Sequence, residues 1–340
     1  MRRAGVPVAG LLLLAGLLLP VAEAAACAAC GNPSLPMQPG GSGVMAGGSG
    51  TFGVSLRGLA MQVTHPAGCA DVNNCDEVPV QPLHDHQVVL APVELGLSGE
   101  WAFNDKWGVE ASLPVRSVWA SVSYHTPDGA DYVPEDAEVH HRDETVAGLT
   151  DGRLMARYSR SVAGVWVAAR VGSTVPLGAT EEDPFSAGDL GKRHQHIQLG
   201  SGAFEPVVSL DATWGGISQQ TTAYATLQQP LYANDKGYEA GRRLLAGAQV
   251  GWKAAPDLLL SLIGEVGHEG GERWQGVVRS DGMTGLTEVR TGASLLWRSE
   301  ALTLQASLRV PVYRVLEASA EEPGEVFAPA SLALGATLPL

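Results

Sequence analysis

Three pairs of histidines lie in polar, acidic segments of the sequence, and imidazole beside carboxylate is a combination that binds metal ions. The pairs are His84 and His86, His140 and His141, and His194 and His196. Neutral imidazole with carboxylate suits Zn²⁺, Cu²⁺ or Ni²⁺. If the three segments meet in the fold, we expect a divalent cation to bind there. The alternative is that these histidines are ordinary polar residues of solvated loops.

The four cysteines form two closely spaced pairs. Cys69 and Cys75 share one polar segment, and we expect a disulfide between them because an exported chain meets an oxidising compartment. Cys27 and Cys30 form a CxxC motif, but no thioredoxin-like pattern follows it. This motif is expected to form a second disulfide or to present two thiols to a periplasmic partner.

Motifs typical of enzymes are absent from the sequence. It contains no GxSxG, HExxH or phosphate-loop motif. We therefore expect no enzymatic activity and no required cofactor, apart from the zinc, copper or nickel that the histidine pairs could bind.

Apolar and polar residues alternate with a period of two along most of the chain, which is the pattern of β-strands. The clearest case is residues 302–313. Most of the predicted strands exceed the roughly 9–11 residues that a tilted strand needs to cross a bilayer. The pattern predicts twelve strands, near residues 51–64, 87–102, 106–124, 145–161, 165–176, 196–214, 217–232, 238–254, 258–274, 286–298, 301–317 and 326–340.

The connections between these strands alternate between short turns and longer, acidic loops. The short turns contain Asn104-Asp105, Ala163-Gly164, Gly215-Gly216, Pro256-Asp257 and Ser299-Glu300. The longer loops lie near residues 65–86, 125–144, 177–195, 233–237, 275–285 and 318–325. This alternation is typical of outer-membrane barrels, which close an even number of strands. We therefore predict an all-β fold, an antiparallel transmembrane β-barrel of about twelve strands with short periplasmic turns and long acidic outer loops. A secreted β-sandwich is the alternative.

Composition and the first residues agree with export to an outer membrane. Only 17% of the 340 residues are charged, the net charge is −14 and the mean hydropathy is +0.05. The acidic balance argues against a nucleic-acid partner, and the low mean hydropathy argues against a multi-helix membrane protein. Arg2 and Arg3 precede an apolar run, which predicts a signal peptide at residues 1–26. A Cys-, Gly- and Pro-rich periplasmic segment at residues 27–50 and a barrel at residues 51–340 would follow. The expected location is the outer membrane of a Gram-negative-type bacterium, in contact with its lipid.

In a barrel, each strand places alternate side chains against lipid and in the lumen. A charge on the lipid face costs about 2–4 kcal/mol at the bilayer midplane, so charged residues within strands are expected to face inward. Such residues either set the selectivity of a pore or pair with one another and plug the lumen, and both remain open. The predicted pore-lining residues are Glu94, Glu110, Arg116, Arg153, Arg157, Arg170, Asp211, Arg243, Glu265, Glu288, Arg290 and Arg309. Tryptophans near strand ends suggest interfacial girdles, namely Trp101, Trp107, Trp119, Trp214, Trp252, Trp274 and Trp297.

Several short segments resemble outer-membrane transporter barrels related to the family named for meta-pathway phenol degradation. Residues 196–206 are similar to that family's Gly-Thr-Gly-x-x-Asp-Pro strand opening, and residues 230–241 and 310–313 are similar to its later strands. Residues 27–35 resemble the Cys-rich Gly-Asp-Pro start of related barrels. The chain departs from these patterns at Ala203 and Glu205, and it ends in Leu340 where many barrels end in an aromatic residue. The resemblance implies channel-type transport of small molecules and no catalytic residues.

Three functions are consistent with these expectations. The first is an outer-membrane channel or transporter for a small solute, with a hydrophobic or aromatic solute among the possibilities. The second is a metal-binding barrel that captures a divalent cation through its His/Asp-rich outer loops. The third is a plugged barrel with a structural or docking role.

Overall fold

The computed structural model describes residues 35, 37, 45–68, 81–135, 142–194, 196–216, 218–278, 285–317 and 325–340. The predicted signal peptide, Cys27, Cys30, Cys69, Cys75 and the pair His140 and His141 lie outside these residues. The two disulfides, the periplasmic partner and the domain limits at residues 26 and 50 therefore stay predictions.

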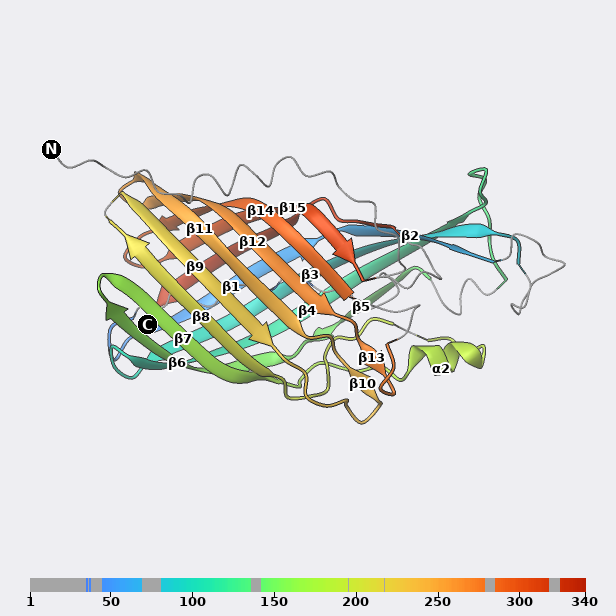
Figure 1. The fold of residues 1–340 in the computed structure, drawn as a ribbon, viewed down its shortest axis with the longest axis horizontal. Helices are drawn as coiled ribbons and strands as arrows, with labels where there is room; N and C mark the ends of the chain where they lie inside the picture. The colour runs from blue at the N-terminus through green and yellow to red at the C-terminus, as the bar shows by residue number, and fades with distance from the viewer. Residues whose placement is uncertain are drawn as a thin grey trace.

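Twelve antiparallel strands close into a barrel (Figure 1). The first and last of them complete the closure, because Thr51 pairs with Pro339 and Leu59 pairs with Ser331. The predicted barrel of twelve strands is confirmed. Its strands are β1 (Gly50–Leu59), β3 (His84–Ala102), β4 (Trp107–His125), β6 (Gly152–Val162), β7 (Val165–Val175), β8 (Pro206–Gly215), β9 (Gln219–Gln228), β11 (Arg243–Ala255), β12 (Leu258–Gly270), β14 (Gly285–Arg298), β15 (Thr303–Leu316) and β17 (Ser331–Pro339).

The outer face of the barrel is apolar because the strands alternate as their sequences do. On β12, Leu260 and Leu262 are exposed, whereas Ser261 and Ile263, which alternate with them, are buried inside. An apolar outer face of this kind is stable only in contact with lipid. Six exposed tryptophans mark the ends of the strands at one rim, namely Trp101, Trp107, Trp166, Trp214, Trp252 and Trp297. Trp274 differs from expectation, because it is buried against Phe185 and Tyr238.

The two ends of the barrel differ in their connections. Residues 103–106, 163–164, 216–218, 256–257 and 299–302 connect strands at one end, where the chain also terminates (Figure 1). We call this the short-turn end and the opposite one the long-loop end. At the turn between β6 and β7, Ala163 and Gly164 have φ values of 50° and 81°, the backbone that tight two-residue hairpins require.

Short elements extend the barrel at its long-loop end. They include β2 (Met61–Ala67), which pairs with β3, and β5 (Glu144–Leu149), which pairs with β4. A third, β16 (Glu325–Phe327), pairs with β2. Figure 1 shows β3, β4 and β2 projecting beyond the rest of the barrel. The loops here also contain α2 (Pro184–Asp189) and a two-stranded sheet of β10 (Tyr238–Glu239) and β13 (Arg273–Trp274). Within the described residues, no helix is long and apolar enough to cross a bilayer.

Several predicted strands are shorter or interrupted in the structure. The strand predicted at residues 196–214 begins only at Pro206. The preceding apolar residues form a loop that crosses the barrel interior, where Ile197 packs against Val88, Leu90 and Val118. The loop has the apolar content of a strand because it buries side chains in the same way. The strands predicted at 51–64, 145–161 and 326–340 are each interrupted once, and those at 238–254 and 258–274 each lose a short piece to the β10–β13 sheet.

Candidate functional site

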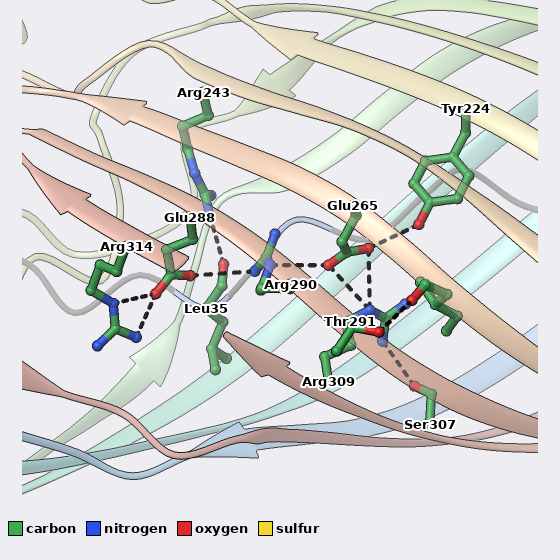
Figure 2. A network of polar contacts seen from close by, with 11 residues as sticks. Leu35, Tyr224, Arg243, Glu265, Glu288, Arg290, Thr291, Ser307, Arg309 and Arg314 are labelled. Carbon is green, nitrogen blue, oxygen red and sulfur yellow. Dashed lines mark hydrogen bonds and ion pairs between the residues drawn. The ribbon is translucent and has the colours of Figure 1, made fainter. Parts of the chain in front are cut away.

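The largest polar network in the lumen is centred on Glu265 of β12 (Figure 2). Its carboxylate forms ion pairs with Arg290 (3.1 Å) on β14 and Arg309 (3.2 Å) on β15. The hydroxyl of Tyr224 on β9 also donates to it, at 2.8 Å. A second carboxylate, Glu288, bonds to Arg314 at 2.5 Å and lies 3.9 Å from Arg290. The network therefore crosses five neighbouring strands of the wall.

A glycine on the strand between them lets Tyr224 reach Glu265. Gly247 on β11 pairs directly with both residues. A Cβ at Gly247 would lie 2.8 Å from the Tyr224 hydroxyl oxygen and 2.8 Å from the Cβ of Glu265. Any side chain at this position would obstruct the bond across β11.

Two further charge networks lie on other strands of the wall. Glu94 on β3 binds Arg57 (2.5 Å) and Arg116 (2.9 Å), which extend from the neighbouring strands β1 and β4. Arg170 on β7 bonds to Glu110, at 2.6 Å, and to Asp211. Each network places opposite charges together, which offsets the cost of removing them from water.

A further ion pair, outside these three networks, lies near the short-turn end. Arg157 on β6 lies 3.0 Å from Glu100 on β3. Its side chain passes over Gly108 of β4, where a Cβ would lie 2.9 Å from the Arg157 guanidinium. Gly108 therefore serves the same purpose here as Gly247 does on β11.

These charges are buried although they face the lumen. The exposed fractions are 0% for Arg157, 2% for Arg170, 4% for Glu265 and Arg309, and 5% for Arg290. In an open aqueous pore, such side chains would contact the water of the pore. The lumen is therefore filled by packed side chains at the level of these networks.

Two residues from the N-terminal part of the chain lie inside the barrel. Arg243 on β11 donates to the backbone carbonyl of Leu35 at 2.6 Å. Met37 is buried against Tyr224 and Leu245. The N-terminal part of the chain thus contributes apolar side chains to the lumen.

Two adjoining cavities remain within this filled interior. The larger, of about 270 Å³, is lined by side chains from nine of the twelve barrel strands, with Arg57, Arg116 and Arg153 among them. The smaller, of about 80 Å³, is mostly apolar and includes Leu35, Leu286 and Val326. Three residues line both cavities, namely Met37, Arg243 and Glu269. A compartment of mixed polarity and a mostly apolar one therefore meet at these three residues.

The structure places all twelve predicted pore-lining residues on the inner face of the barrel. Ten of them belong to the ion pairs described above, and Arg243 lies 3.6 Å from Glu269. Arg116 and Arg153 also line the larger cavity, and Arg153 donates to the amide oxygen of Gln228 at 2.8 Å. Whether these residues control the passage of a solute stays a prediction.

Sequence reasoning missed several residues of the site. Glu100 could have been found, because it has the same phase as Glu94 on β3, and so could Arg57, because charge within a strand is expected to face inward. Arg314 could not, because it has the opposite phase to Arg309 along β15. The register shift between β14 and β15 leaves Val312 without a partner and turns Arg314 inward, opposite Glu288. Leu35 and Met37 carried no sequence signal for the lumen.

The predicted metal-binding histidines form two clusters in the described residues. His84 and His86 contact each other, and His86 also contacts His65. His194 and His196 contact each other, with ring centroids 5.1 Å apart, and His196 also contacts Phe185. Among the residues that the structure describes, no group of three or more His, Cys, Asp and Glu side chains is arranged to hold a metal ion.

A closed barrel with an apolar outer face and a charged inner face is the fold of outer-membrane β-barrel proteins. No family model and no curated protein matches the sequence. Among solved structures, the fold is similar to that of an outer-membrane channel from Pseudomonas putida F1, with a TM-score of 0.55 and 13% sequence identity over 90% of this chain and 100% of that chain. A FadL homologue from Pseudomonas aeruginosa has a TM-score of 0.42 and 9% identity, over 85% of this chain and 90% of that one. The toluene transporter of Ralstonia pickettii has a TM-score of 0.34 and 10% identity, over 86% and 90%.

Proposed function

We propose that this protein is an outer-membrane channel for small solutes that combine an apolar body with a polar or anionic group. The observation that carries the proposal is the pair of adjoining cavities inside a closed barrel, the larger lined by polar and apolar groups together and the smaller mostly apolar. The short-turn end would face the periplasm and the long-loop end the exterior, as in other barrels of this kind. The channel function of the similar P. putida protein is consistent with this proposal.

The filled lumen favours selective passage over general diffusion. The buried side chains of Arg157 and Arg170 and their ion pairs occupy part of the lumen, which favours a narrow route over a wide aqueous pore. A solute that binds in the cavities could instead replace its contacts with water by contacts with protein side chains. Binding sites that are mostly apolar with a few placed polar groups are typical for such solutes.

The larger cavity is lined by four arginines and four carboxylates, and among these arginines Arg153 favours an anionic group on the solute. Arg153 donates to the neutral amide of Gln228, and within the described residues it belongs to none of the ion pairs. A carboxylate on the solute would supply the missing opposite charge and two acceptors for the guanidinium. Small aromatic carboxylates are therefore suitable probes.

Proteoliposome swelling tests the proposal. Liposomes that contain the refolded protein are placed in isotonic benzoate or in isotonic arabinose. We expect faster swelling in benzoate than in arabinose, after subtraction of protein-free liposomes. Equal rates in both would indicate a general pore, and no swelling in either would support the plugged structural barrel.

A matched pair of variants tests the route. Ser112 lines the larger cavity, whereas its neighbour Ala111 is exposed on the outer face of β4. We expect Ser112→Trp to fill the cavity and to reduce benzoate entry severalfold, and Ala111→Trp to leave it unchanged. If both variants transport benzoate like the parent protein, the cavity does not lie on the route.

A further inference from the structure

A compact histidine cluster lies on the extension at the long-loop end, outside the lumen network described above. His65 is on β2, and His84 and His86 are on β3, where they share one face of the strand. His65 pairs directly with His86 across the two strands. Tyr124 and Tyr132 pack against the same rings, at centroid distances of 4.7–4.9 Å. Figure 1 shows these strands projecting beyond the barrel.

The hydrogen bonds of His84 determine which of its nitrogens carries a proton. Its Nδ1 lies 2.7 Å from the carbonyl oxygen of Pro82. A carbonyl only accepts hydrogen bonds, so Nδ1 is the donor and carries the proton. In the neutral ring, Nε2 then has a lone pair. A histidine held through Nδ1–H by a backbone carbonyl is the usual arrangement of a metal ligand.

The lone pair of His84 Nε2 points at the corresponding nitrogen of His86. The two Nε2 atoms are 2.9 Å apart. Without metal, His86 must therefore donate its Nε2 proton to His84. When a metal binds, the proton of His86 moves from Nε2 to Nδ1 through solvent. The His86 ring then moves off the line of the His84 lone pair, so that both Nε2 lone pairs converge on the metal. No net proton is released from two neutral rings in this exchange.

The 2.9 Å separation is that of an N–H···N hydrogen bond, and it also matches the separation of two neighbouring ligands in a planar metal site. Metal–imidazole bonds are about 2.0–2.1 Å long, so two neighbouring ligands in a square-planar arrangement lie about 2.9 Å apart. A tetrahedral ion such as Zn²⁺ would need them about 3.3 Å apart. Square-planar or tetragonal geometry with nitrogen ligands is typical of Cu²⁺ and Ni²⁺, and Cu²⁺ forms the more stable complexes.

We propose that His84 and His86 bind one Cu²⁺ ion in adjacent coordination positions through their Nε2 atoms, on the outer extension of the barrel. Water completes the coordination. His84 is nearly fully buried and His86 is partly exposed, so the ion enters from the side of His86. His65 packs against the edge of the His86 ring, at a centroid distance of 4.7 Å, and restrains its orientation. The site is separate from the lumen and does not depend on the proposed channel function.

Copper titration of the untagged, detergent-solubilised full chain tests this proposal. Bound Cu²⁺ is counted, and its electron paramagnetic resonance spectrum is recorded for couplings to imidazole nitrogen. We expect His84→Phe/His86→Phe to bind one Cu²⁺ fewer than the parent protein, and each single variant to weaken binding at least about tenfold. The control His194→Phe/His196→Phe retains an aromatic ring at each position and should bind as the parent does.

Three results would overturn the proposal. One is an unchanged copper count and spectrum in the double variant, and another is loss of copper in the control instead. The third is tighter binding of Zn²⁺ than of Cu²⁺ at the same site. Phenylalanine preserves the ring packing against Tyr124 and Tyr132, and heat-modifiable electrophoretic mobility verifies folding.

A second measurement needs no variant. In the parent protein, Cu²⁺ with ascorbate and oxygen oxidises the histidines that bind it, and mass spectrometry locates the products. We expect oxidation at His84 and His86 in preference to His194, His196 and His268. Oxidation that is absent from both His84 and His86 would also contradict the proposal.

Discussion

Glu265 is the residue on which the lumen network depends. Two buried arginines and a tyrosine direct their donors at its carboxylate. Removing one partner of a buried charge pair leaves the other charge uncompensated, which costs far more than the pair itself contributes. The stability of the lumen is therefore concentrated at this carboxylate.

We expect Glu265→Gln to lower the free energy of unfolding by about 3–5 kcal/mol, because Arg309 would stay buried without its counter-charge and Arg290 would keep only Glu288, at 3.9 Å. Urea unfolding of the refolded protein, followed by tryptophan fluorescence, measures the change. The control is Glu300→Gln, since Glu300 is exposed in the turn between β14 and β15. Equal unfolding midpoints for the two variants would contradict this account of the network.

The second expectation at this scale concerns Gly247. Alanine there would place its Cβ 2.8 Å from both the carbonyl oxygen of Gly264 and the hydroxyl oxygen of Tyr224. We expect Gly247→Ala to destabilise the protein by about 1–3 kcal/mol through overpacking. Gly216→Ala is the matched control, because no atom lies within 4 Å of a Cβ at that turn position. Unfolding midpoints measured side by side decide the matter, and no difference between them would refute the expectation.

At the scale of elements, interruptions of strands position the loops that line the cavity. The strand predicted at residues 145–161 is interrupted between β5 and β6, and Asp151 lies in the interruption. One oxygen of its carboxylate accepts from the backbone N–H of Gly178 at 3.1 Å. The other accepts from the backbone N–H and the hydroxyl of Ser201 at 2.7 and 2.8 Å. A single carboxylate thus joins two inward-folded loops.

We expect Asp151→Asn to loosen these loops, because the asparagine amide would direct donors at donors. The cost is about 1–3 kcal/mol for each buried group left unsatisfied. Limited proteolysis should cut the variant faster at residues 176–183 or 197–205 than it cuts the parent protein. Asp257→Asn, in an exposed short turn, should leave the cleavage rates unchanged. A cleavage pattern identical to that of the parent would show that Asp151 does not hold the loops.

The bulge on β15 is the second element-scale feature. Val289 pairs with Tyr313, and Arg290 pairs with Pro311, so Val312 is the extra residue. Below the bulge, Arg309 faces the lumen, and above it Arg314 does so. Arg314 also donates to the carbonyl of Val326 on β16 at 2.8 Å. The bulge therefore brings a second arginine to the same side of the wall, where it contacts the extension.

For the molecule as a whole, the outer face must match lipid. Leu262 lies midway along β12 and is 53% exposed on the outer face. At this position, a charged side chain would have to leave water for hydrocarbon. The apolar belt should therefore tolerate charge much less well than the loops do.

We expect Leu262→Arg to lower the free energy of unfolding in lipid by about 2–4 kcal/mol. Leu190→Arg is the control, because Leu190 is 68% exposed beside α2, in a loop at the long-loop end. Urea unfolding in lipid vesicles measures both variants. If the two substitutions cost the same, the outer face is not a membrane surface.

The sequence by itself determined the class of fold. A period of two in apolar residues, long strands and alternating short and long connections depend on local geometry, since each residue in a strand faces one side or the other. The phase of each strand also placed twelve charged residues inside, because charge is costly in lipid. These inferences needed no knowledge of which strands contact each other across the lumen.

Only the tertiary structure decided what fills the barrel. The loop at residues 196–205 has strand-like alternation, yet it crosses the interior and packs against β3 and β4. The inward position of Arg314 follows from one unpaired residue in a register with β14. The copper site proposed at His84 and His86 depends on a 2.9 Å contact between two nitrogens. All three depend on side chains that meet in space after closure, and a local pattern does not encode such long-range contacts.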